Sequence, residues 1–306
     1  MAEIGSFHVG GRRVAVSGRP VETIHFTETA SYPYDPNGHF HIEQAYVQFL
    51  VPVERRLDLP VVFLHGGGMS GAMWEATPDG RTGWLWSFLA AGCAVYNVDG
   101  VERGRAGWCA VDGQWPDVPI IRSEEEAWEL FRIGPAEGYE QRVPFPGSRF
   151  PADHLGAFTA QFVPRWTSTT PAAVAAFEAA VERIGPCVVV CHSQGGGVAL
   201  DVAARRPDLV RATVAVEPSG FPAYYPEELG ACPGLVVLGD HLDRVPLFVR
   251  LRQQLDQHVA AVTNRGGSVR ILDLPAVGVT GNSHMLMMDD NAEEIADMIL
   301  DWLREQ

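Results

Sequence analysis

One stretch of the chain joins an apolar strand, a tight turn and a helix, with a serine at the turn. Residues 187–191 read Cys-Val-Val-Val-Cys, a continuous apolar run typical of a buried strand in a parallel sheet. His192, Ser193 and Gln194 follow, and the glycines 195–197 open a predicted helix that ends near residue 206. A strand that turns into a helix in this way strains a serine and exposes its hydroxyl above the sheet. The pattern predicts a nucleophile, and an ordinary small-residue turn is the alternative.

A second glycine-rich turn follows an earlier apolar strand, residues 59–64. It reads His65-Gly66-Gly67-Gly68, and glycines there let backbone N–H groups approach a substrate carbonyl. Such a turn supplies one donor of an oxyanion hole, and the N–H of Gln194 at its helix start supplies the other. The turn does not fit a phosphate loop, because no Lys follows it and no helix opens directly after it. We expect Gln194 with Gly67 or Gly68 to form the oxyanion hole, and His65 to fix the turn by hydrogen bonds.

The basic residues exclude several classes of protein. All 23 Lys and Arg residues among the 306 are Arg, so the chain cannot form a Schiff base or act as a P-loop NTPase. The formal net charge is −15, and so acidic a chain lacks the basic surface that nucleic acid requires. The same charge should repel anionic lipid, and no apolar run reaches the ~18 residues of a membrane span. We therefore expect neither nucleic acid nor a membrane as partner.

The order of elements predicts a mostly parallel α/β sheet with antiparallel strands at its N-terminal end. Within residues 7–53, two apolar runs flank Gly10-Gly11, a hairpin signal. Strand–turn–helix units then alternate, as in an α/β fold. Residues 108–169 break this rhythm and are rich in Pro, Gly and aromatic side chains. We expect 1–107 and 170–306 to form the core and 108–169 an inserted cap.

A general base and its acid partner have candidates in the later strands. His284 lies in a polar loop between the last predicted strand, 269–272, and the closing helix, 292–303. In α/β folds that carry a serine nucleophile at a strand-to-helix turn, the chain order is Ser, acid, His. Glu217 ends one apolar strand, where a buried carboxylate needs a partner such as a His. Asp240 or Asp243 follows the next strand, although either could instead cap the helix that starts near Pro246.

In these motifs the chain resembles the α/β-hydrolases, and within them a group of bacterial esterases. The long stretch from His65 to Trp84, HGGGMSGAMWEATPDGRTGW, carries most of the resemblance, and shorter matches include Asp99–Trp108, His192–Gly196, Val216–Gly220 and Gly281–His284. The resemblance implies an α/β-hydrolase fold. It also implies a triad of Ser193, His284 and Glu217, because that group carries a Glu at the equivalent strand end. Cys191 departs from the usual pattern, which has Gly there.

The expected activity is hydrolysis of a carboxylic ester or a lactone through an acyl-enzyme, with no cofactor. Two alternatives remain: a C–C bond hydrolase with the same triad, and a non-catalytic small-molecule receptor, which would have lost a triad member or the oxyanion turn. We expect four aromatic residues of the insertion to form an apolar wall of the substrate pocket: Trp128, Phe131, Phe158 and Phe162. His39 and His41 share a strand face, but without a third ligand we expect no metal.

The compartment follows from the cysteines and the N-terminus. The chain has five Cys, an odd number, without a CxxC motif, which favours a reducing compartment. Residues 1–20 contain no apolar signal-peptide core. We expect a cytoplasmic protein, or a periplasmic or secreted one if a leader has been removed. The expected partner is a small-molecule ester or lactone, and the sequence leaves a monomer or a homodimer open.

Overall fold

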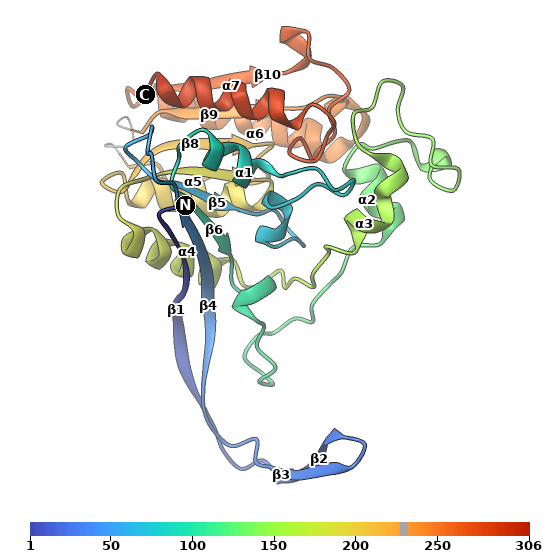
Figure 1. Cartoon of the computed structure of the whole chain (residues 1–306), viewed down its shortest axis with the longest axis vertical. Helices are drawn as coiled ribbons and strands as arrows, with labels where there is room; N and C mark the ends of the chain where they lie inside the picture. The colour runs from blue at the N-terminus through green and yellow to red at the C-terminus, as the bar shows by residue number, and fades with distance from the viewer. Residues whose placement is uncertain (227–231) are drawn as a thin grey trace.

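A computed structural model describes residues 1–226 and 232–306. Its centre is an eight-stranded sheet in the order β1-β4-β6-β5-β7-β8-β9-β10 (Figure 1). The strands are β1 Glu3–Val16, β2 Glu22–Thr27, β3 Ala30–Tyr34, β4 Gly38–Val51, β5 Val61–Leu64, β6 Val95–Asp99, β7 Cys187–His192, β8 Val210–Val216, β9 Gly234–Leu238 and β10 Val269–Asp273. The α-helices are α1 Trp84–Ala90, α2 Glu124–Leu130, α3 Leu155–Thr159, α4 Thr170–Ile184, α5 Gln194–Arg205, α6 Pro246–Thr263 and α7 Ala292–Arg304.

The sheet is mostly parallel, as the sequence predicts. From β6 to β10 neighbouring strands run parallel, whereas β4 pairs antiparallel with both β1 and β6. Parallel strands end at one edge of a sheet, so the turns after β5, β7 and β8 lie together. The glycine-rich turn 65–68 follows β5, Ser193 follows β7, and Glu217 follows β8.

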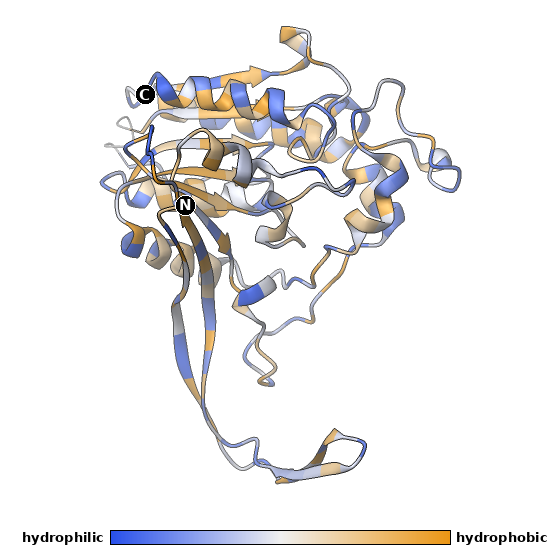
Figure 2. Cartoon of the chain, in the orientation of Figure 1, coloured by the Kyte–Doolittle hydropathy of each residue, from blue (hydrophilic) through white to orange (hydrophobic). Residues whose placement is uncertain are grey.

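Alternation of side chains along the central strands creates two apolar layers. Val61 and Phe63 of β5 face a cluster that includes residues of α1 and α7, and Val62 and Leu64 face a cluster under α4, α5 and α6. This period of two is what a strand covered on both faces requires. In Figure 2 the central strands are accordingly hydrophobic along most of their length.

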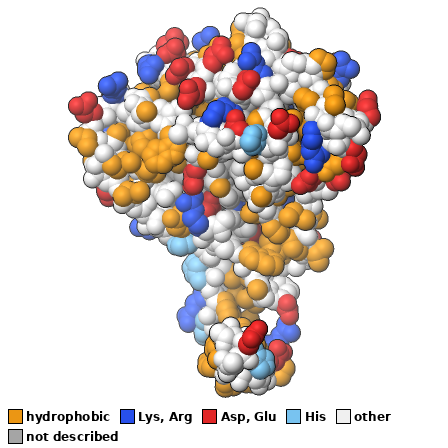
Figure 3. Space-filling view, turned by 45° about the vertical axis from the view of Figure 1, so that its right-hand side comes forward, with side chains coloured by type: hydrophobic (Ala, Val, Ile, Leu, Met, Phe, Trp, Pro, Cys, Tyr) orange, Lys and Arg blue, Asp and Glu red, His pale blue; other side chains and the backbone are white. Residues whose placement is uncertain are grey.

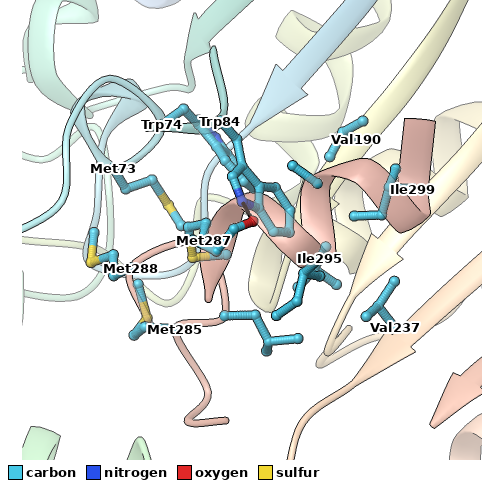
Figure 4. Close-up of a cluster of buried hydrophobic side chains, with 14 of the residues drawn as sticks. Met73, Trp74, Trp84, Val190, Val237, Met285, Met287, Met288, Ile295 and Ile299 are labelled. Atoms are coloured by element: carbon cyan, nitrogen blue, oxygen red, sulfur yellow. Dashed lines mark hydrogen bonds between the residues drawn. The ribbon is translucent and has the colours of Figure 1, made fainter. Parts of the chain in front are cut away.

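The first of these layers also holds the loop that carries His284. Trp74 and Trp84 stack with ring centroids 5.8 Å apart, and the Trp84 indole donates to the Ala292 carbonyl at 2.7 Å. Figure 4 shows these rings beside methionines that directly follow His284, Met285, Met287 and Met288, all of them fully buried. Packing of these side chains anchors the chain immediately after His284.

The expected hairpin at Gly10-Gly11 is wrong. β1 runs through both glycines and pairs with β4 over its whole length, and the chain reverses later, through β2 and β3 (Figure 1). Both glycines have positive φ, and a Cβ at Gly11 would lie 2.5 Å from the Ile42 carbonyl oxygen. The pair therefore permits a distortion within a long strand rather than a turn. The outer parts of β1 and β4, together with β2 and β3, form an arm that projects from the body (Figures 1 and 3).

The segment 108–169 contains two short α-helices, and backbone hydrogen bonds attach it to the glycine-rich turn after β5 and to the loop that carries His284. Val163 N–H donates to the Gly68 carbonyl, and His284 N–H donates to the Phe131 carbonyl, each at 2.9 Å. Several of its aromatic side chains join the same apolar cluster as α1 and α7. The division into a core and a cap stays a prediction. Among the described residues no helix is both long and apolar enough to cross a membrane.

Candidate active site

Ser193 occupies a strained turn between β7 and α5. Its φ is +49° and its ψ −120°, a conformation that residues other than glycine rarely adopt. The turn leaves no room for larger neighbours, since a Cβ at Gly195 would lie 2.3 Å from the His65 carbonyl oxygen. The Ser193 N–H donates to the Val216 carbonyl at 3.0 Å. The glycines of the motif thus allow α5 to start against the glycine-rich turn.

His284 and Glu217 form a buried hydrogen-bonded pair. Nδ1 of His284 and Oε2 of Glu217 are 2.6 Å apart, and both side chains are almost completely buried. Glu217, at φ +45°, is a second strained residue, and its Oε1 accepts from the Gly239 N–H at 2.7 Å. The imidazole is therefore held through Nδ1, which leaves Nε2 for a substrate or nucleophile.

Burial and neighbouring charges set the protonation of this pair. Burial alone would raise the pKa of Glu217, but Arg132 and His284 outweigh it, and its pKa lies below the usual value. Burial lowers the pKa of His284, and the hydrogen bond that His284 donates to Glu217 raises it. The imidazole is then neutral, as a general base must be, at and above its ordinary pKa.

The other two acid candidates are engaged elsewhere. The carboxylate of Asp240 accepts from the backbone N–H groups of His241 and Gly281, at 2.7 and 2.9 Å. Asp243 lies exposed in a short 3₁₀ helix, Leu242–Arg244. Asp240 therefore braces the loop that leads to His284, but Glu217 is the carboxylate that contacts the imidazole.

Arg132, which the sequence did not indicate, contacts the same Glu217. It follows α2 at φ +59°, and its side chain is fully buried. One guanidinium nitrogen donates to Glu217 Oε1 at 2.5 Å, and Nε donates to the Asp240 carbonyl at 2.7 Å. The guanidinium also lies over the Phe248 ring, 4.3 Å from its centroid. Glu217 is thus held by a cation on one oxygen and by His284 on the other.

Two further histidines form hydrogen bonds that hold the glycine-rich turn and the loop that carries His284. Nε2 of His65 accepts from the Gly100 N–H at 3.0 Å, so Nδ1 carries the proton and donates to the Gly66 carbonyl at 2.8 Å. Burial lowers the pKa of His65 to about 4, which keeps it neutral. His192 donates from Nε2 to the His284 carbonyl at 2.9 Å. The expected role of His65 in fixing its turn is in agreement with these contacts.

A cavity of about 110 Å³ brings the candidate residues together. Ser193, Gln194, Gly67 and His284 all line it, and Gly68 does not. The remaining lining residues come from segment 108–169 (Arg122, Leu130, Phe131 and Arg165), from the turn after β8 (Ser219) and from the start of α6 (Leu247, Phe248 and Leu251). The Ser219 hydroxyl lies 3.4 Å from that of Ser193.

The expected aromatic wall needs correction. Of its four members, Phe131 lines the cavity and stacks on the His284 ring, with centroids 5.3 Å apart. Trp128 and Phe158 have no exposed surface and belong to the apolar core, and Phe162 packs against that core. Aromatic residues in an irregular segment can face a pocket or the core, and these three pack in or against the core.

Two substitutions distinguish an aromatic residue of the cavity wall from one of the apolar core. Phe131→Ala should change the relative kcat/KM for acetyl and benzoyl esters, because it removes a wall of the cavity. Phe158→Ala should instead lower the free energy of unfolding by ~3–5 kcal/mol, the cost of truncating a buried Phe, and leave the ranking of esters unchanged. Thermal unfolding and kcat/KM on both esters measure the two effects. If Phe158→Ala changed the relative kcat/KM for the two esters, Phe158 would belong to the pocket wall, as the sequence predicts.

His39 and His41 do not gather further metal ligands. Both are exposed on β4, and His41 Nε2 lies 3.1 Å from the Gly10 carbonyl oxygen. Within residues 1–226 and 232–306, no group of three or more His, Cys, Asp or Glu side chains is arranged to hold a metal ion.

The chain is similar to known proteins in both sequence and structure. No protein-family model matches the chain. A solved structure of a novel bacterial esterase is 32% identical, with a TM-score of 0.83, and the match covers 99% of this chain and 96% of that one. A protein named "Probable secreted lipase phiG", from a fungus (strain ATCC 74256), is 27% identical, over 98% of this chain and 94% of the relative.

Proposed function

Because the chain belongs to the esterases of the α/β-hydrolase fold and is a carboxylic ester hydrolase, we propose that it works through an acyl-enzyme on Ser193. The observation that carries the proposal is the pair of His284 and Glu217, 2.6 Å apart, at a cavity that Ser193 also lines. A nucleophile, a base and a group that orients the base are the parts that such chemistry needs.

The proposed reaction has two stages. The Ser193 hydroxyl attacks the ester carbonyl while Nε2 of His284 accepts its proton, and the tetrahedral intermediate then collapses as His284 returns that proton to the leaving alcohol. Water attacks the acyl-enzyme in the same way and releases the acid. Glu217 keeps the imidazole oriented through Nδ1 and stabilises its protonated form. No cofactor takes part in the proposed steps.

The oxyanion is proposed to bind the backbone N–H groups of Gln194 and Gly67. Gln194 opens α5, where unpaired N–H groups and the helix dipole favour negative charge. A Cβ at Gly67 would lie 2.5 Å from the Gln194 side-chain oxygen, so a larger residue there would displace the end of that side chain. Its exposure to the cavity favours Gly67 over Gly68 as the second donor.

A lactone is a cyclic ester, so the same residues would open it, and the proposal includes lactones as substrates. The C–C hydrolase alternative has no observation of its own in its favour. The receptor alternative predicts a missing part, whereas Ser193, His284 and Glu217 are all present.

The test is a substrate panel combined with covalent labelling. Purified protein is assayed on p-nitrophenyl esters, lactones and a vinylogous diketone, and is then treated with a fluorophosphonate probe. We expect turnover of esters, inactivation by the probe, and a label on the peptide that contains Ser193. Turnover of the diketone alone, or a label on a different serine, would contradict the proposal.

A further inference from the structure

A second cavity, four times larger, adjoins the first. Its volume is about 440 Å³, against 110 Å³ for the cavity at Ser193, and the two share Gln194 and Ser219 as lining residues. It lies among α4, α5 and the ends of β5 and β6. Six of its apolar lining residues are Leu64, Val98, Val101, Val174, Phe177 and Val198.

The two volumes differ in what they can hold. Ligand pockets in proteins measure ~300–1,000 Å³ and are lined mainly by apolar groups. The larger cavity is within this range, whereas the smaller one has room for little more than the reacting ester group. We propose that the larger cavity binds the apolar part of the substrate, so that the enzyme acts on esters with a long or bulky hydrocarbon group.

Ser219 and Gln194 line both cavities, and in the proposal the hydrocarbon group of the substrate passes between them. Ser219 faces the Ser193 hydroxyl at 3.4 Å and also lines the larger cavity. The Gln194 side chain accepts from Arg165 at 3.1 Å, which holds it against the glycine-rich turn. A chain attached to the carbonyl at Ser193 would therefore leave the small cavity between these two residues. This inference rests on the proposed function.

Ala173 offers a test because it lines the larger cavity from α4, away from the catalytic residues. Ala173→Phe should fill part of the cavity and lower kcat/KM for long esters at least about tenfold, with acetyl esters unchanged. Ala175 is exposed on the same helix, so Ala175→Phe is the matched control and should change neither. Ala173→Leu serves if the Phe variant does not fold.

The assay uses two series, p-nitrophenyl esters from acetyl to decanoyl and acetates of alcohols from ethanol to decanol. A length effect in either series that Ala173→Phe removes and Ala175→Phe keeps supports the inference. The inference is overturned if the wild type hydrolyses acetyl esters but shows no length effect in either series, or if Ala173→Phe keeps the length effect of the wild type. Absence of any ester hydrolysis in the wild type would instead reject the proposed function itself.

An independent observation concerns Arg132. Three of the seven non-glycine residues with positive φ among those described are Ser193, Glu217 and Arg132, and backbone strain of this kind gathers at functional sites. Arg132 donates to Glu217 at 2.5 Å while its side chain is fully buried. The geometry points to Arg132 as a positioning residue that fixes the Glu217 carboxylate toward His284.

The charge of Arg132 also acts on His284. The charged and titratable groups around the imidazole are Glu217 and Arg132, Arg122 of segment 108–169, and His192 at the end of β7. Burial lowers the His284 pKa most, Glu217 raises it, and the Arg132 and Arg122 cations lower it further. Removal of the Arg132 charge should therefore raise the pKa of His284, and the base would become protonated at a higher pH.

The test compares Arg132→Gln and Arg132→Lys with the wild type by kcat/KM against pH. We expect Arg132→Gln to lose about 10- to 100-fold in kcat/KM and to shift the acidic limb of the profile to higher pH. Arg132→Lys keeps the charge and should keep the limb. A limb that stays in place in Arg132→Gln, with activity and thermal stability lowered together, would reduce Arg132 to a structural role.

Discussion

Ser193→Ala is expected to lower kcat for ester hydrolysis by several orders of magnitude while the fold remains intact. The substitution removes the hydroxyl that we propose forms the acyl-enzyme, and what remains is the contribution of the oxyanion hole and substrate binding. Alanine fits the turn, since its side chain is no larger than that of serine. Initial rates on an acetyl ester, with circular dichroism and thermal unfolding to verify the fold, measure the effect.

Ser219 supplies the matched control for this experiment. Its hydroxyl is 3.4 Å from that of Ser193. Ser219 itself lies in the turn after β8 and does not start a helix. Ser219→Ala should reduce kcat by less than about tenfold and should still react with the fluorophosphonate probe. If Ser219→Ala instead lost activity and labelling while Ser193→Ala retained them, the nucleophile would have to be reassigned.

The parts of the molecule that the sequence predicts well are local ones. The strand, serine and glycines at 187–197 form a pattern that can be recognised within about ten residues. The contacts that favour glycine at 195 and 196 are with His65 and Pro218, which the pattern itself does not include. The alternation of apolar runs with helices likewise predicts the parallel sheet, which the structure and the similar bacterial esterase confirm.

Other parts depend on contacts between distant segments. Arg132 lies 85 residues from Glu217 and 108 from Asp240, and nothing in its own surroundings indicates a buried cation. The aromatic residues of 108–169 have no periodicity that separates a pocket wall from the core. At Gly10-Gly11 the composition of a turn is present, but pairing with β4 continues through it. The role of each catalytic residue stays a prediction until it is tested by substitution.

Glu217→Gln is expected to lower kcat by roughly 10²–10⁴, as loss of the acid does in other triads. Gln has almost the same shape, but it cannot stabilise the protonated imidazole by charge. Its amide can also donate to Nδ1, which would favour the wrong tautomer of His284. In addition, the buried Arg132 would lose its anionic partner, so some loss of stability should accompany the loss of activity. Rates on an acetyl ester, together with the melting temperature, separate the two effects.

The neighbouring carboxylates decide whether this effect is specific to Glu217. Asp240→Asn and Asp243→Asn should each cost less than about tenfold in kcat, because Asp240 is occupied by two backbone N–H groups and Asp243 is exposed. Asp240→Asn retains one acceptor oxygen, so its main effect should be looser attachment of the loop from Gly281 to His284. That loosening should appear as a lower melting temperature. A larger loss of kcat in either Asp variant than in Glu217→Gln would move the triad acid from the end of β8 to the loop after β9.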